Sequence, residues 1–139
     1  MTATKAFVDT NILVYSVDQR DLRKQEMAQS LLRKLSLAGN GVISAQITQE
    51  FSVTLISKLR YTPSQVREFC AGLSDLEFVA PTFQTTITAL RIMERWQLSF
   101  WDSLLFAAAK DADCQILYTE DLSHGQVIEG IRIINPFLP

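Results

Sequence analysis

Four acidic residues stand where their carboxylates could meet in one site. They are Asp9, Glu50, Asp102 and Asp121. Each follows a predicted strand or lies in the first turns of a predicted helix. In open α/β sheets, ligands bind at the carboxyl ends of the strands, where residues distant in sequence come together. The spacing therefore predicts one acidic site built from four separate segments.

Four carboxylates gathered at one edge repel each other unless a cation neutralises them. Oxygen ligands without His or Cys select hard ions, so we expect Mg²⁺ or Mn²⁺. One or two such ions can activate water for attack on a phosphodiester, and no protein nucleophile is then required. The residues alone thus indicate metal-assisted phosphoryl chemistry, and they leave the number of ions open.

Each acid also has a simpler interpretation. Asp102 could cap a helix, Asp121 could form an Asx turn, and Glu50 could be a surface helix residue. Asp9 is the hardest to explain structurally, because it ends a buried apolar strand and needs a polar partner. Glu120 adjoins Asp121 and could replace it in the site.

Alternating strands and helices are expected to position these acids. Strands are predicted at 5–8, 42–43, 78–80, 115–118 and 131–134, and helices at 21–38, 46–59, 63–73, 82–96 and from Asp102 onward. The 21–38 helix should stop at Gly39, and Thr62-Pro63 should start the 63–73 helix. This order predicts one α/β domain over residues 1–139, with a mostly parallel sheet of about five strands flanked by helices.

Composition sets limits without naming a substrate. The chain has 139 residues, 47% hydrophobic and 20% charged, with a net charge of −2. No apolar run is long enough to span a membrane, and no signal peptide is seen, so we expect a cytoplasmic protein. The lone cysteines Cys70 and Cys114 are expected to be buried free thiols. An acidic chain does not by itself indicate RNA binding, and the local basic clusters are expected to be solvated helix faces.

Five further residues have a possible functional role. His124, the single histidine, is expected to make a loop hydrogen bond rather than titrate in catalysis. Trp96 and Trp101 could stack on a base, although core or dimer packing is favoured. Arg91 and Arg95 precede Asp102 and could hold phosphates or acidic groups of a partner.

The motifs around the four acids resemble those of PIN-domain nucleases, specifically VapC-type toxins of toxin–antitoxin pairs. The stretch 7–15 (FVDTNILVY) resembles the opening motif of that family. The stretches 100–105 (FWDSLL) and 118–122 (YTEDL) resemble the segments with the third and fourth acids, and Glu50-Phe51 fits the second. The likeness covers essentially the whole chain, in order and at suitable spacing.

This resemblance implies a PIN-like three-layer fold and a Mg²⁺- or Mn²⁺-dependent endoribonuclease. It implies that the four acids are catalytic and metal-binding, and that Thr10, Asn11 and Thr119 orient ligands or water. It also implies an RNA substrate, a VapB-type antitoxin as partner, and a homodimer. Three alternatives stay open: a receiver-like signalling module, an aspartate-dependent phosphohydrolase and a catalytically idle PIN-fold scaffold. A receiver domain needs a lysine after a late strand, and the phosphohydrolase needs an aspartate where Asn11 stands, so both fit poorly.

Overall fold

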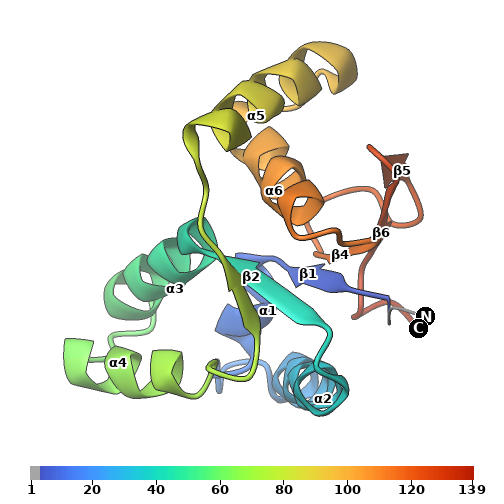
Figure 1. Ribbon diagram of the computed structural model, residues 1–139. Helices are drawn as coiled ribbons and strands as arrows, with labels where there is room; N and C mark the ends of the chain where they lie inside the picture. Colours follow the sequence, from blue (N-terminus) through green and yellow to red (C-terminus); the bar gives the residue numbers. More distant parts are fainter. Residues whose placement is uncertain (1–3) are drawn as a thin grey trace.

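The computed structural model describes residues 4–139, in which a six-stranded sheet forms the centre of the molecule (Figure 1). The strand order is β3-β2-β1-β4-β6-β5. All neighbouring strands are parallel except β5 and β6. The strands are β1 (Ala6–Val8), β2 (Gly41–Ser44), β3 (Glu77–Val79), β4 (Ile116–Tyr118), β5 (Val127–Ile128) and β6 (Ile131–Ile134).

Six helices of the described chain cover this sheet. They are α1 (Thr10–Tyr15), α2 (Leu22–Ala38), α3 (Ala45–Ser57), α4 (Pro63–Ala71), α5 (Phe83–Trp96) and α6 (Phe100–Asp111). In Figure 1, α5 and α6 lie together above the sheet, and α1, α2 and α4 lie below it. The predicted α/β architecture, with a mostly parallel sheet between helical layers, is confirmed.

Local sequence signals define several helix ends. Asp21 caps α2 by accepting a hydrogen bond from the Lys24 backbone N–H at 3.1 Å, and Gly39 ends this helix with a left-handed φ of 67°. Thr62 and Gln65 form a capping box at the start of α4, with Pro63 in its first turn. Both predicted helix boundaries, at Gly39 and at Thr62-Pro63, are confirmed.

The pairing of β1 with β4 places the ends of these strands side by side. β1 is buried along its whole length and lies between β2 and β4. Val8 pairs with Tyr118, and the Asp9 N–H donates to the Tyr118 carbonyl at 3.0 Å. The residues that follow the two strands, Asp9 and Thr119, are therefore neighbours although they are far apart in sequence.

Two elements were not predicted from the sequence. Helix α1 begins directly after β1, where the apolar run Ile12-Leu13-Val14 resembles a continuing strand. Strand β5 has only two residues and pairs antiparallel with β6 across Glu129 and Gly130. Both turn residues have positive φ, 53° and 77°, which suits a tight two-residue hairpin. The sheet consequently has six strands in the described residues, not about five.

The two cysteines were predicted to be buried free thiols, and no membrane-spanning segment was predicted. Cys114 is buried and Cys70 is partly buried, and neither forms a disulfide. Burial raises the pKa of the Cys114 thiol to about 12, so it stays protonated near neutral pH. Within residues 4–139, none of the helices has the length and apolar character needed to cross a membrane.

Candidate active site

Asp9 lies at the junction of β1 and α1, where it is the N-cap of the helix. Its carboxylate accepts hydrogen bonds from the Thr10 N–H at 2.7 Å and from the Thr119 hydroxyl at 2.8 Å. Only 7% of Asp9 is exposed. This burial raises the pKa of Asp9 to about 6, since the hydrogen bonds offset it only in part and the nearby Asp121 and Glu50 carboxylates raise it further. A strongly perturbed carboxylate in a cleft is a functional candidate.

Asn11 connects α1 to the segment that follows β4. Its side-chain N–H₂ group donates to the Asp121 carboxylate at 2.9 Å and to the Thr119 hydroxyl at 3.2 Å. Its oxygen accepts the Glu120 N–H at 3.4 Å, and the Thr119 hydroxyl accepts the Asp121 N–H at 3.1 Å. The predicted polar residues Asn11 and Thr119 thus join Asp9 and Asp121 into one hydrogen-bonded unit.

Glu50 reaches the same unit from α3. One of its carboxylate oxygens accepts the Thr10 hydroxyl at 3.1 Å, and the other accepts the Gln46 side-chain N–H at 2.6 Å. Glu50 is exposed, whereas Phe51 beside it is buried in the core. The helix therefore anchors its apolar face and presents Glu50 toward the acids at the sheet edge.

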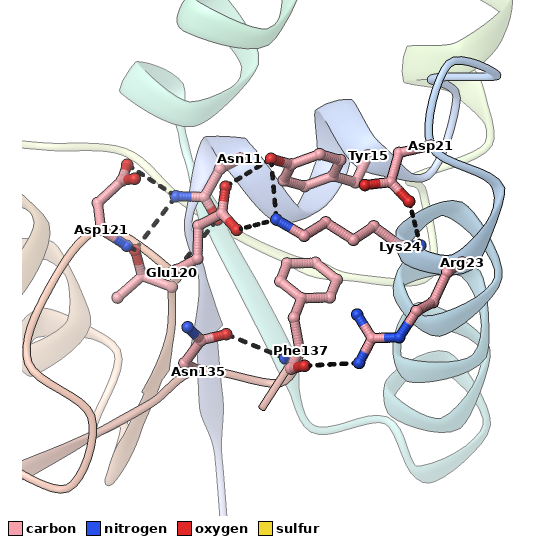
Figure 2. A network of polar contacts seen from close by, with 10 residues as sticks. Asn11, Tyr15, Asp21, Arg23, Lys24, Glu120, Asp121, Asn135 and Phe137 are labelled. Carbon is pink, nitrogen blue, oxygen red and sulfur yellow. Dashed lines mark hydrogen bonds and ion pairs between the residues drawn. The ribbon is translucent and has the colours of Figure 1, made fainter. Parts of the chain in front are cut away.

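Glu120 lies beside Asp121, but other partners engage its carboxylate (Figure 2). One oxygen accepts the Tyr15 hydroxyl at 2.6 Å, and the other pairs with the Lys24 ammonium at 2.8 Å. The hydrogen bond to Glu120 is the main cause of a raised Lys24 pKa. Among residues 4–139, the one hydrogen bond found to the Asp121 carboxylate comes from Asn11. This difference favours Asp121 over Glu120 as the acid available to a ligand.

The C-terminal segment completes the network around Lys24 (Figure 2). The Lys24 ammonium lies 5.2 Å from the centre of the Phe137 ring and 4.7 Å from that of Tyr15. The Phe137 carbonyl accepts the Arg23 guanidinium at 2.9 Å. His124 accepts the Asn135 N–H at 3.0 Å through Nδ1, so the predicted loop hydrogen bond of this histidine is confirmed.

These segments enclose a cleft of about 370 Å³ at the carboxyl end of the sheet. Its carboxylates come from β1, α3 and the segment after β4: Asp9, Glu50, Glu120 and Asp121, with Asp18 farther along. Thr10, Asn11 and Tyr15 lie between them. A cleft lined by several carboxylates and few apolar groups is suited to a hard cation and to a ligand that the cation binds.

Asp102 is not among the residues that line this cleft. It lies in the first turn of α6, and its N–H donates to the Ser99 hydroxyl at 3.1 Å. Ser99, not Asp102, is therefore the N-cap of that helix. Within residues 4–139, no set of three or more His, Cys, Asp or Glu residues is close enough to hold a metal ion. Three of the four predicted acids, Asp9, Glu50 and Asp121, line the cleft, and the role of Asp102 stays a prediction.

The remaining candidates lie elsewhere. Arg91 and Arg95 line a separate hollow with Glu129, whose carboxylate is 3.8 Å from the Arg95 guanidinium. Trp96 donates to Glu129 at 2.8 Å. Trp101 is 63% exposed on α6, so it does not pack in the core of this chain, and its packing in a dimer stays a prediction.

The family model for the PIN domain matches residues 6–128, most of the chain. The chain belongs to the PIN-domain family. No curated protein matches it by sequence. The fold of this PIN domain also agrees with solved structures that share few of its residues.

A chain of a toxin–antitoxin complex from Klebsiella pneumoniae matches with a TM-score of 0.71 and 19% identity, over 96% of this chain and 98% of that one. VapC20 of Mycobacterium tuberculosis, a toxin that cleaves the sarcin-ricin loop, matches with a TM-score of 0.63 and 18% identity, over 84% and 90%. A chain of the DNA-bound VapBC complex of Salmonella typhimurium matches with a TM-score of 0.66 and 20% identity, over 94% of this chain and 97% of that one. At such identities the likeness is one of fold.

Proposed function

We infer that this PIN-domain protein is a metal-dependent endoribonuclease and the toxin of a type II toxin–antitoxin pair. The observation that carries the inference is the cleft in which Asp9, Glu50 and Asp121 converge on the end of the sheet. The toxin assignment is supported by the VapC and toxin–antitoxin proteins that share the fold. It implies a VapB-type antitoxin partner, a homodimer and action in the cytoplasm.

The donor set of the cleft suits Mg²⁺ or Mn²⁺, because its ligands are oxygens and neither His nor Cys lines it. Asp9 and Asp121 would hold the ion, with Glu50 beside them and Asp102 added on the family likeness. When bound, such an ion supplies the charge that activates water and stabilises the leaving oxygen of a phosphodiester.

The protein itself orients the acids. Asn11 and Thr119 fix the Asp9 and Asp121 carboxylates relative to each other. The Thr10 hydroxyl and the Gln46 side chain each donate a hydrogen bond to the Glu50 carboxylate, which directs this acid toward the cleft. Ligands held in this way lose little freedom when they bind, which favours both affinity and correct geometry.

The test is cleavage of cellular RNA by the purified protein with Mg²⁺, with Mn²⁺ and with a chelator. We expect cleavage only with metal, and losses of at least about 100-fold for Asp9→Asn and Asp121→Asn, since removal of one electrostatic group at a reacting centre costs that much. Glu94→Gln on α5 is the matched control, because Glu94 is an exposed acid outside the cleft. Cleavage that persists in chelator, or full activity of both variants, would refute the proposal.

A further inference from the structure

The acidic cleft changes sign along its length. Glu50, Thr54 and Lys58 recur every fourth residue on α3 and its C-cap, so they share one helix face, and all three line the cleft. Eight residues of helix correspond to about 12 Å, at 1.5 Å per residue. Lys58 therefore lies about 12 Å along the helix from Glu50, at the end of the cleft where the Asp18 carboxylate is paired with Arg20.

Arg20 lies at the same end of the cleft, in the loop between α1 and α2. Asp18 holds it with a two-pronged contact: Nε donates to one carboxylate oxygen at 2.9 Å and Nη2 to the other at 3.0 Å. The Arg20 backbone N–H also donates to Asp18 at 3.0 Å. The Asp18 side chain is only 6% exposed, while that of Arg20 is 69% exposed. A buried carboxylate thus fixes a guanidinium that still faces solvent.

The fixed guanidinium keeps hydrogen-bonding capacity for a ligand. Arginine has five N–H donors, and Asp18 uses one on Nε and one on Nη2, so three are left. A hydrogen bond from the segment between α3 and α4 also holds the loop that contains Arg20: the Tyr61 hydroxyl donates to the Val17 carbonyl at 2.7 Å. An arginine that is already ordered loses less entropy when it binds an anion.

Arg20 and Lys58 stand where two hollows meet. Both also line a second hollow of about 300 Å³, which continues past Asp18 toward Leu59 and Tyr61. The two hollows share Asp18, Arg20 and Lys58 in their linings, so a ligand that extends from the acidic cleft into this hollow would lie beside both cations. Lys58 forms no ion pair with any of residues 4–139, in contrast to Lys24, whose charge is used by Glu120.

We propose that Arg20 and Lys58 form a rim that binds a backbone phosphate of single-stranded RNA, one or more nucleotides away from the phosphate that is cut. The proposal rests on the proposed ribonuclease function for the choice of ligand. It explains how an acidic protein with an acidic cleft holds a polyanion, because the rim binds the chain beyond the carboxylates. Arg20 supplies a fixed fork for phosphate oxygens, and Lys58 adds a mobile point charge.

The experiment measures cleavage and binding of a labelled single-stranded RNA by the full chain, its Arg20→Gln and Lys58→Gln variants and the double variant. We expect KM to rise and kcat to stay within about twofold, because the rim binds the chain and not the reacting group. The slope of log(kcat/KM) against log[salt] should become shallower by about 0.7 per lost contact, or about 1.4 in the double variant. When the salt concentration is raised from about 50 to 200 mM, the kcat/KM of the parent protein should then fall about sevenfold more than that of the double variant.

A Lys34→Gln, Arg67→Gln double variant is the matched control. It removes two exposed charges that lie outside both hollows. Arg20→Lys keeps the charge but loses the fork, so its KM should fall between those of the parent and Arg20→Gln. The rim is refuted if the Arg20 and Lys58 variants match the control in KM and salt slope, or if only kcat falls.

Binding measured by anisotropy in chelator separates this proposal from the ribonuclease function. If the parent binds RNA through Arg20 and Lys58 but cuts none with metal, the rim stands and the proposed activity fails. If the parent cuts RNA and the rim variants do so with unchanged KM, the activity stands and the rim fails. If RNA binding in chelator is unaffected by both substitutions, the rim is refuted whatever the cleavage result.

Discussion

Replacing Asp9 with asparagine should make the fold more stable at neutral pH while it removes the proposed activity. Asp9 has an ordinary pKa of 3.8 and a folded-state pKa of about 6, chiefly because of burial. At 1.36 kcal/mol per pH unit, this difference corresponds to about 3 kcal/mol of destabilisation when the folded protein must carry the ionised carboxylate. Asparagine is nearly isosteric with protonated aspartate, and it carries no charge.

The sign of the effect depends on pH in a defined way. Between pH 3.8 and about 6 the folded state binds the Asp9 proton more tightly than the unfolded state does. The contribution of Asp9 to stability therefore falls as pH rises through this window and is constant above it. Relative to Asp9→Asn, the parent protein should lose on the order of 3 kcal/mol between pH 4 and pH 7.

The assay is urea unfolding of both proteins in chelator at several pH values from 4 to 7.5. The difference between the two unfolding free energies is the observable, because carboxylates such as Asp18 and Glu129, whose pKa values are lowered by their hydrogen bonds, contribute equally to both proteins. Asparagine has one acceptor oxygen and can accept from Thr10 or from Thr119 but not from both, so the lost hydrogen bond should cost about 1 kcal/mol at every pH and leave the pH dependence unchanged. A difference that does not change with pH would refute the assignment of Asp9 as a buried, destabilised carboxylate.

Three further predictions concern the neighbouring acids and one helix end. Glu120→Gln should reduce RNA cleavage less than Asp121→Asn, because Glu120 is engaged by Lys24 and its loss disturbs the site indirectly; equal losses in a cleavage assay would contradict this order. In thermal denaturation, Mn²⁺ should raise the Tm of the parent protein but not that of Asp121→Asn, because a bound ion stabilises the folded state. The same measurement on Asp102→Asn tests whether Asp102 binds the ion, since the Mn²⁺-induced rise in Tm is then lost. Gly39→Ala should cost about 1 kcal/mol in urea unfolding, since alanine is strained at a φ of 67°; an unchanged midpoint would count against it.

Much of the fold could be predicted from the sequence because its signals are local. The period of apolar residues in α2 and α3 follows from helix geometry, and residues such as Thr62 and Gly39 end helices through contacts with their own neighbours. No element was predicted for helix α1, because its apolar run Ile12-Leu13-Val14 is too short to show a helical period and its position beneath the sheet is not a local signal.

Hydrogen bonds between distant segments could not be predicted in this way. The sequence indicated two neighbouring acids after β4, and only the structure showed Lys24 and Tyr15 bound to Glu120. The four-residue spacing of Glu50, Thr54 and Lys58 was visible in the sequence as a helix face. That Arg20, from another loop, lies beside Lys58 at the end of the cleft is a feature of the tertiary structure alone.

The four carboxylates show where this division lies. The sequence by itself indicated that Asp9, Glu50, Asp102 and Asp121 follow strands or lie in the first turns of helices, and hence predicted a cation-binding acidic site. Only the tertiary structure showed that Asp9, Glu50 and Asp121 line one cleft and that the Glu120 carboxylate pairs with Lys24. The reason is physical: residue type and periodicity act over a few neighbours, whereas the register of β1 against β4 brings together side chains that are 110 residues apart, such as those of Asp9 and Thr119.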